Sequence, residues 1–95
     1  MNALVSIITP SYNSAKFIAE TIQSVQNQTY PNWEMIIVDD GSSDETECVV
    51  LSIIQNDNRI QFHKLNQNSG PAVARNTGIE KASGDYMTFI DADDI

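Results

Sequence analysis

The hydrophobic residues of the chain fall into short runs, and polar segments separate one run from the next. Residues 4–8 form a mostly β-branched run that ends before Thr9 and Pro10, and residues 34–38 form a second run that ends before two aspartates. Short apolar runs without alternation are typical of strands that are buried on both faces of a parallel sheet. We therefore predict two central strands over these runs.

A segment with helical spacing follows each of these strands. The first helix is predicted to begin at Asn13 or Ser14, either of which can cap it, and to end near Gln28. Its apolar face recurs at intervals of three and four residues and consists of Phe17, Ile18, Ile22 and Val25. Ser42 and Glu45 fit a capping box at the start of the second helix. The apolar face of that helix consists of Val49, Val50, Ile53 and Ile54.

The remaining pattern predicts a third helix and two more strands. Residues 59–65 alternate apolar with polar side chains, as expected of a half-covered strand at the edge of a sheet. A helix should start at Gly70 and Pro71, because proline is favoured in the first helical turn, and Gly84 fits its stop. Residues 85–90 contain the last apolar run and predict the fourth strand.

Strands and helices alternate strictly in this prediction, and the order ends on a strand. Such an order calls for an α/β fold in which right-handed crossovers join parallel strands, as in half of a Rossmann fold. Ligands of such sheets bind at the carboxyl ends of the strands. The residues that suggest chemistry all fall in the loops at that rim, which are residues 9–14, 39–44, 66–70 and 91 onward.

Three carboxylates, those of Asp91, Asp93 and Asp94, follow the fourth strand. Alternate residues of an extended segment point the same way, so Asp91 and Asp93 could address one ligand. Hard oxygen ligands suit Mg²⁺ or Mn²⁺, and such a metal could bridge two phosphates of a nucleotide. The alternative is that these residues form a turn or cap a helix.

A second acidic pair, Asp39 and Asp40, ends the second strand before Gly41. A carboxylate there could accept a hydrogen bond from a base imide or a ribose hydroxyl, and Gly41 lets the backbone turn close to a ligand. The alternative is an Asx turn that caps the second helix, and one aspartate can cap while the other binds. Tyr12, just past the first strand, either lies flat against a nucleobase or packs against the helix start.

Gly70 and Arg75 bring positive potential to the same rim. Gly70 sits at a predicted helix N-terminus, where free N–H groups and the helix dipole attract anions. Arg75 lies about one turn inside that helix, where it could pair with Asp39, Asp40 or a diphosphate. The alternative for Arg75 is a structural ion pair with one of the strand-end carboxylates.

Composition narrows the class of protein further. The 95 residues suit one domain, and 13 acidic against 5 basic residues give a net charge of -8. This sign opposes a general affinity for nucleic acid or for an anionic membrane. No apolar stretch approaches the ~20 residues that span a bilayer, and no basic leader precedes the first strand, so we expect a cytoplasmic protein.

Taken together in order and spacing, the motifs resemble the amino-terminal half of a family 2, GT-A type glycosyltransferase. The resemblance runs from near Val5 to the last residue, and it rests on residues 5–13, 28–30, 34–44, 68–78, 84–86 and 89–94. It implies the Rossmann-like three-layer half of a GT-A fold, with four parallel strands in the order 3-2-1-4 and three helices.

The resemblance also implies a function, namely inverting transfer of a sugar from a nucleotide diphosphate sugar to an acceptor hydroxyl in polysaccharide biosynthesis. The donor is usually a UDP-sugar, the cofactor is Mn²⁺ or Mg²⁺, and the acceptor is a glycan or a lipid-linked glycan. The implied donor-binding residues are Pro10, Tyr12, Asp39, Asp40, Gly70, Arg75 and Asp91. The implied metal ligand is Asp93, with Asp91 and Asp94 as further candidates.

In this family the general base that deprotonates the acceptor is expected further along the chain. We therefore expect residues 1–95 to form a donor-binding subdomain that is inactive alone, with the acceptor-binding part outside it. A membrane attachment would also belong to that other part. The fourth strand would lack a neighbour, and an uncovered strand edge invites pairing with another chain, so we expect self-association through it.

Three other functions compete with this interpretation. A phosphoaspartate receiver domain also has acidic strand ends, but it needs a strand-end lysine, whereas Lys64 is within a strand and Lys81 is late in a helix. A haloacid-dehalogenase-like phosphatase opens its fold with a motif like residues 89–93, which here come last. A module that binds nucleotide or metal without catalysis is the third.

Overall fold

The computed structural model describes residues 3–92, in which strands and helices alternate as predicted. The elements are β1 (Val5–Ser11), α1 (Ile18–Gln26), β2 (Trp33–Asp39), α2 (Thr46–Ile54), β3 (Ile60–Lys64), α3 (Pro71–Lys81) and β4 (Tyr86–Phe89). No helix in this described part is long and apolar enough to cross a membrane.

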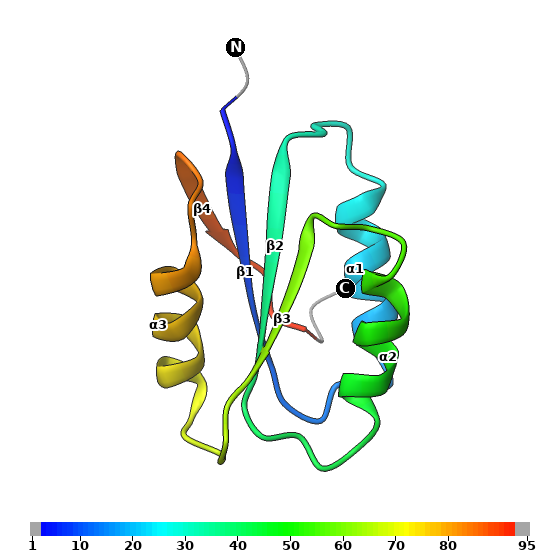
Figure 1. The fold of residues 1–95 in the computed structure, drawn as a ribbon, viewed down its shortest axis with the longest axis vertical. Helices are drawn as coiled ribbons and strands as arrows, with labels where there is room; N and C mark the ends of the chain where they lie inside the picture. The colour runs from blue at the N-terminus through cyan, green and yellow to red at the C-terminus, as the bar shows by residue number, and fades with distance from the viewer. Residues whose placement is uncertain (1–2, 93–95) are drawn as a thin grey trace.

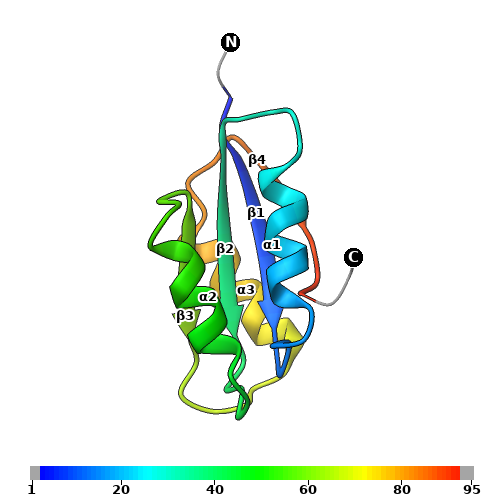
Figure 2. The same cartoon turned by 90° about the vertical axis from the view of Figure 1, so that its right-hand side faces the viewer.

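The four strands form one parallel sheet in the order β3-β2-β1-β4. Helix α3 covers one face of the sheet, and helices α1 and α2 cover the other (Figure 1). Figure 2, turned by a quarter, shows α1 and α2 in front of the sheet and α3 behind it. The predicted three-layer fold and its strand order are confirmed.

The core explains why the middle of β2, from Met35 to Val38, is uniformly apolar. Met35 and Ile37 point into the layer with α1 and α2, whereas Ile36 and Val38 point toward α3 and pack with Ala74. Successive side chains of a strand alternate between its two faces, so a strand covered on both sides needs apolar residues throughout. All four β2 side chains named here are fully buried.

Strand β1 continues to Ser11, beyond the predicted end at residue 8, and the additional residues form part of the rim. The strand continues through Pro10 to Ser11, although a proline cannot donate to a sheet. Its carbonyl can still accept, and it receives the N–H of Ala92 at 3.3 Å. The Ser11 carbonyl accepts the N–H of Asp40 at 2.8 Å. Because β1 is central, neighbours on both sides keep it extended.

The helix ends differ from the predicted caps. Helix α1 begins at Ile18, whose N–H bonds the carbonyl of Ser14, and no side chain caps it. Helix α2 also has no side-chain cap, so the predicted capping box of Ser42 and Glu45 is wrong. Helix α3 begins at Pro71 as predicted but ends at Lys81, so Gly84 is not its stop.

Strand β4 is the edge opposite β3, and all of its side chains are exposed. Within the described part of the chain, β4 pairs with β1 alone. Self-association through this strand stays a prediction.

A buried carboxylate, Glu34 on β2, ties the connection between α3 and β4 to the sheet. It accepts the hydroxyl of Ser6 at 2.6 Å and the N–H of Ser83 at 2.7 Å. The Ser6 hydroxyl in turn accepts the N–H of Gly84 at 2.8 Å. This network fixes where α3 lies on the sheet, and α3 carries part of the functional rim.

The Glu34 network makes the stability of the fold depend on pH. Burial raises the pKa of Glu34, but hydrogen bonds from Ser6, Ser83 and Gly84 outweigh it and hold the pKa below its ordinary value of 4.5. A carboxyl with a lowered folded pKa stabilises the fold above its unfolded pKa, and this is lost as the pH falls through the folded pKa. We expect the free energy of unfolding in urea to fall as the pH is lowered below about 4.5, the ordinary pKa of a glutamate, and to fall less in Glu34→Gln.

Some pH dependence should remain in Glu34→Gln, because the hydrogen bond from Arg59 holds the pKa of Asp57 at about 2. Equal losses of unfolding free energy in the variant and the parent protein would contradict the role given to Glu34.

Candidate functional site

A cavity of about 460 Å³ opens at the carboxyl ends of the strands, where the sequence places the suggestive residues. Six of the predicted binding residues line it, and these are Pro10, Tyr12, Asp40, Gly70, Arg75 and Asp91. Its other lining residues are Ser11, Ser14, Asn68, Pro71, Ala74 and Ala92. Segments from β1, the end of β2, the start of α3 and the end of β4 therefore meet at one site.

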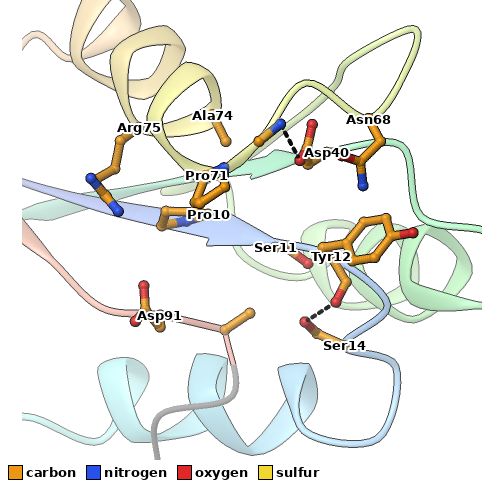
Figure 3. A pocket seen from close by; sticks show the side chains of 12 residues that line it. Pro10, Ser11, Tyr12, Ser14, Asp40, Asn68, Pro71, Ala74, Arg75 and Asp91 are labelled. Atoms are coloured by element: carbon orange, nitrogen blue, oxygen red, sulfur yellow. Dashed lines mark hydrogen bonds between the residues drawn. The ribbon is translucent and has the colours of Figure 1, made fainter.

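The cavity has two chemically different ends (Figure 3). Tyr12, Asp40 and Asn68 lie at one end, where an aromatic face stands near a carboxylate and an amide. Arg75 and Asp91 lie at the other end, on opposite walls. An elongated ligand with a planar ring at one end and an anionic group at the other matches this division.

Asp40 is buried, and backbone groups fix its orientation. Its Oδ1 accepts the N–H of Ser69 at 2.7 Å, and its Oδ2 accepts the N–H of Gly70 at 2.9 Å. These bonds anchor the loop before α3 to the end of β2, and they use the N–H of Gly70 that the sequence suggested for an anion. Each carboxylate oxygen has a second lone pair, so Asp40 can still accept from a ligand N–H or O–H.

The structure does not bring Asp39 to the cavity. Its side chain has no exposed surface and accepts both the N–H and the hydroxyl of Ser42, at 2.8 Å and 2.5 Å. Asp39 is the last residue of β2, so the two adjacent aspartates point to opposite sides of the strand. Asp39 thus holds the turn after β2 through Ser42 without capping α2, so the predicted helix-capping Asx turn is not formed, while Asp40 faces the cavity.

Gly41 lets two rim loops touch. Its φ is +76°, and a Cβ at this position would lie 3.0 Å from the backbone nitrogen of Asn68. The turn after β2 therefore packs directly against the loop before α3, which brings Asn68 to the cavity.

Arg75 is exposed and takes part in no ion pair among residues 3–92, where Asp57 pairs with Arg59 and Glu47 pairs with Lys64. A structural ion pair with Asp39 or Asp40 is therefore not formed in the described structure. The guanidinium is available to an anionic ligand, and its planar fork of N–H donors suits phosphate oxygens.

Asp91 is exposed at the cavity, whereas Asp93 and Asp94 lie outside the described residues. Residues 3–92 contain no group of three or more His, Cys, Asp or Glu side chains that could hold a metal ion. The carboxylate of Asp91 is a hard oxygen donor of the kind that Mg²⁺ and Mn²⁺ prefer, so it fits such a metal as one ligand of several.

Ser11 and Asn68 also line the cavity, and the sequence patterns selected neither as a binding residue. The Ser11 hydroxyl is buried and has no hydrogen-bond partner in the described structure. The strand that carries it runs beyond Pro10, where a strand is expected to end. Asn68 reaches the site through the contact with Gly41, which links loops that are distant in sequence.

The chain is similar in sequence to members of one known protein family. The sequence profile described as Glycosyl transferase family 2 matches residues 6–95. The chain is 48% identical over 92 residues to the UDP-Glc:alpha-D-GlcNAc-diphosphoundecaprenol beta-1,3-glucosyltransferase WfgD of Escherichia coli, a match that covers 97% of this chain and 36% of WfgD. The chain spans between 13% and 36% of the length of the curated relatives it matches.

Two solved structures share the fold. S. aureus TarS 1-349 in complex with UDP-GlcNAc matches 94% of this chain and 26% of its own, with a TM-score of 0.87 and 36% identity. The mannosyltransferase PcManGT from Pyrobaculum calidifontis, in complex with GDP-Man and Mn²⁺, matches 98% of this chain and 28% of its own, with a TM-score of 0.90 and 29% identity.

Proposed function

Because the chain belongs to glycosyl transferase family 2, we propose that its cavity binds the nucleoside diphosphate part of a sugar donor, which is a UDP-sugar. Residues 1–95 form the donor-binding part of an inverting glycosyltransferase in polysaccharide biosynthesis. Acceptor binding and the general base belong to the remainder of the protein, as does any attachment to a membrane. The observation that carries this proposal is the division of one cavity into an aromatic, carboxylate end and an arginine end.

The base of the nucleotide is proposed to lie against Tyr12, with Pro10 beneath it and Asp40 at its edge. An ionised carboxylate only accepts hydrogen bonds, so Asp40 favours a base that has a ring N–H on that edge. Uracil has such a group at N3 and guanine has one at N1, whereas cytosine and adenine have acceptors there. The ligands of TarS and PcManGT, UDP-GlcNAc and GDP-Man, are of the favoured kind.

The diphosphate and the sugar are proposed to extend toward Arg75 and Asp91. Arg75 would bind phosphate oxygens, and Asp93 would hold Mn²⁺ or Mg²⁺, with Asp91 and Asp94 as further ligands. A bound divalent metal would neutralise charge on the leaving diphosphate. In the transfer, the acceptor oxygen forms a bond to the anomeric carbon, and the bond from that carbon to the diphosphate breaks with its electrons on the diphosphate. The catalytic general base takes the proton of the acceptor hydroxyl.

Binding of UDP with Mn²⁺, measured by isothermal titration calorimetry, tests this proposal. We expect UDP to bind in the presence of Mn²⁺, and binding to weaken at least ~100-fold in Asp93→Ala, because the metal that would bind with the diphosphate would lose a ligand. CDP, whose cytosine has an acceptor at N3 in place of the ring N–H, should bind far more weakly than UDP.

Glu80→Gln is the matched control, since it removes an exposed carboxylate of α3 outside the cavity. Equal affinity for UDP and CDP would contradict the role of Asp40, and an unchanged Asp93→Ala would contradict the metal site. UDP binding without sugar transfer in the full-length protein would favour a binding module instead of an enzyme.

A further inference from the structure

Asp39 carries a buried negative charge that the cavity does not use. Its side chain has no exposed surface and does not line the cavity. Burial of a carboxylate is costly unless hydrogen bonds replace the lost hydration. Ser42 supplies these bonds, because both its N–H and its hydroxyl donate to the carboxylate.

The Ser42 hydroxyl also contacts the loop after β1, so the orientation that Asp39 gives to this hydroxyl affects that loop. A serine hydroxyl has one proton, and the carboxylate can only accept, so Asp39 sets the direction of that proton. The lone pairs of Ser42 Oγ then face the N–H of Asn13, which donates to Oγ at 2.7 Å. Two residues near the end of β2 thereby hold a backbone group near the end of β1.

The backbone of Asn13 adopts the left-handed conformation, so it needs contacts that stabilise this conformation. Its φ is 49°, and among the described residues it is the one non-glycine residue with a positive φ. Residues with a side chain rarely adopt this conformation, although asparagine tolerates it. Its own Oδ1 accepts the N–H of Ser43 at 2.9 Å, which joins the two loops a second time.

Tyr12 directly precedes Asn13, and its orientation depends on this backbone. The ring stands at the mouth of the cavity and is 51% exposed (Figure 3). Its hydroxyl takes part in none of the hydrogen bonds found among the described residues. The direction of the ring is therefore set by β1 on one side and by the left-handed turn at Asn13 on the other.

We propose that Asp39 is a positioning residue, which holds Tyr12 over the cavity through Ser42 and Asn13. The proposal rests on the nucleotide-binding function given above, in which Tyr12 stacks on the base. Asp39 and Asp40 thus serve the same ligand by different means, since Asp40 contacts the base and Asp39 fixes the ring that covers it.

The test is a double-mutant cycle on UDP affinity, measured by calorimetry on the protein that contains this chain. Ser42→Ala breaks the connection and leaves Asp39 and Tyr12 in place. We expect it to weaken UDP binding about five-fold, the typical worth of one hydrogen bond. In a Tyr12→Ala background the same substitution should leave the affinity unchanged, since the ring that it positions is absent. Ser42→Thr keeps the hydroxyl and should restore the affinity.

Equal losses in both backgrounds would overturn the proposal, because Ser42 would then act on the fold as a whole. An unchanged affinity in Ser42→Ala would overturn it too. If Ser42→Ala does not fold by circular dichroism, Asp39→Asn takes its place, since an amide has one acceptor oxygen and cannot accept both the N–H and the hydroxyl of Ser42, and the same outcomes decide. Absence of UDP binding by the parent protein would instead refute the proposed function, and the positioning role with it.

Discussion

Asp40→Asn is expected to weaken UDP binding about 100-fold. The substitution replaces a charged carboxylate, which accepts through two oxygens, with a neutral amide, which accepts through one oxygen and donates through its NH₂ group. The carboxylate accepts two backbone N–H groups, and it is proposed to accept the base N–H as well. An asparagine side chain has one acceptor oxygen, so its NH₂ group must face one of these donors. Affinity measured by calorimetry tests the ligand contact.

The same substitution should lower the free energy of unfolding by about 2 kcal/mol, since Ser69 or Gly70 loses the acceptor for a partly buried N–H. Urea denaturation measures this loss. Glu45→Gln is the matched control, because Glu45 is exposed, carries the same charge and lies outside the cavity. A protein with Asp40→Asn that binds UDP as tightly as the parent would exclude Asp40 from the base contact.

Gly84→Ala is expected to destabilise the fold by about 3 kcal/mol, the upper range for an overpacked contact. A Cβ at this position would lie 2.5 Å from Ser6 Oγ and 2.8 Å from both Leu4 O and Ser6 N. Two of these three atoms belong to the backbone of β1 or the residue before it, so rotation of a side chain cannot relieve the clash. The hydrogen bond from Gly84 N–H to Ser6 would also be distorted.

Thermal and urea denaturation would measure this effect. Ser83→Ala, at the neighbouring position, is the control and should cost about 1 kcal/mol, because it removes one hydroxyl contact to Glu34 and leaves the Ser83 N–H in place. Similar losses in the two variants would show that the close approach of Gly84 to β1 does not limit stability.

The fold could be predicted from the sequence because its strongest signals are local. The apolar run from Met35 to Val38 requires a strand covered on both faces, and Pro71 marks the start of α3 whatever lies around it. The strand order and the identity of the rim followed from the alternation of elements and from the family resemblance. The order is confirmed by the structure.

The helix caps and the different roles of Asp39 and Asp40 could not be predicted from the sequence, because they depend on partners that are distant in sequence. Asn13 looks like a helix cap, but its side chain bonds Ser43, which is 30 residues away. Asp39 and Asp40 are indistinguishable by local chemistry. Which of them faces the cavity depends on where β2 ends, and a shift of one residue would exchange their roles.

The loop before α3 is attached to Asp40 through main-chain N–H groups, so its attachment does not depend on the side chains at positions 68 and 69, although the positive φ of 97° at position 70 favours glycine there. Any residue except proline can supply the N–H of position 69. Substitutions in this loop, including those at Asn68 beside the cavity, can therefore change what the wall offers to a ligand without releasing the wall itself. Relatives of this chain could diversify their donors at these positions while the fold stays constant.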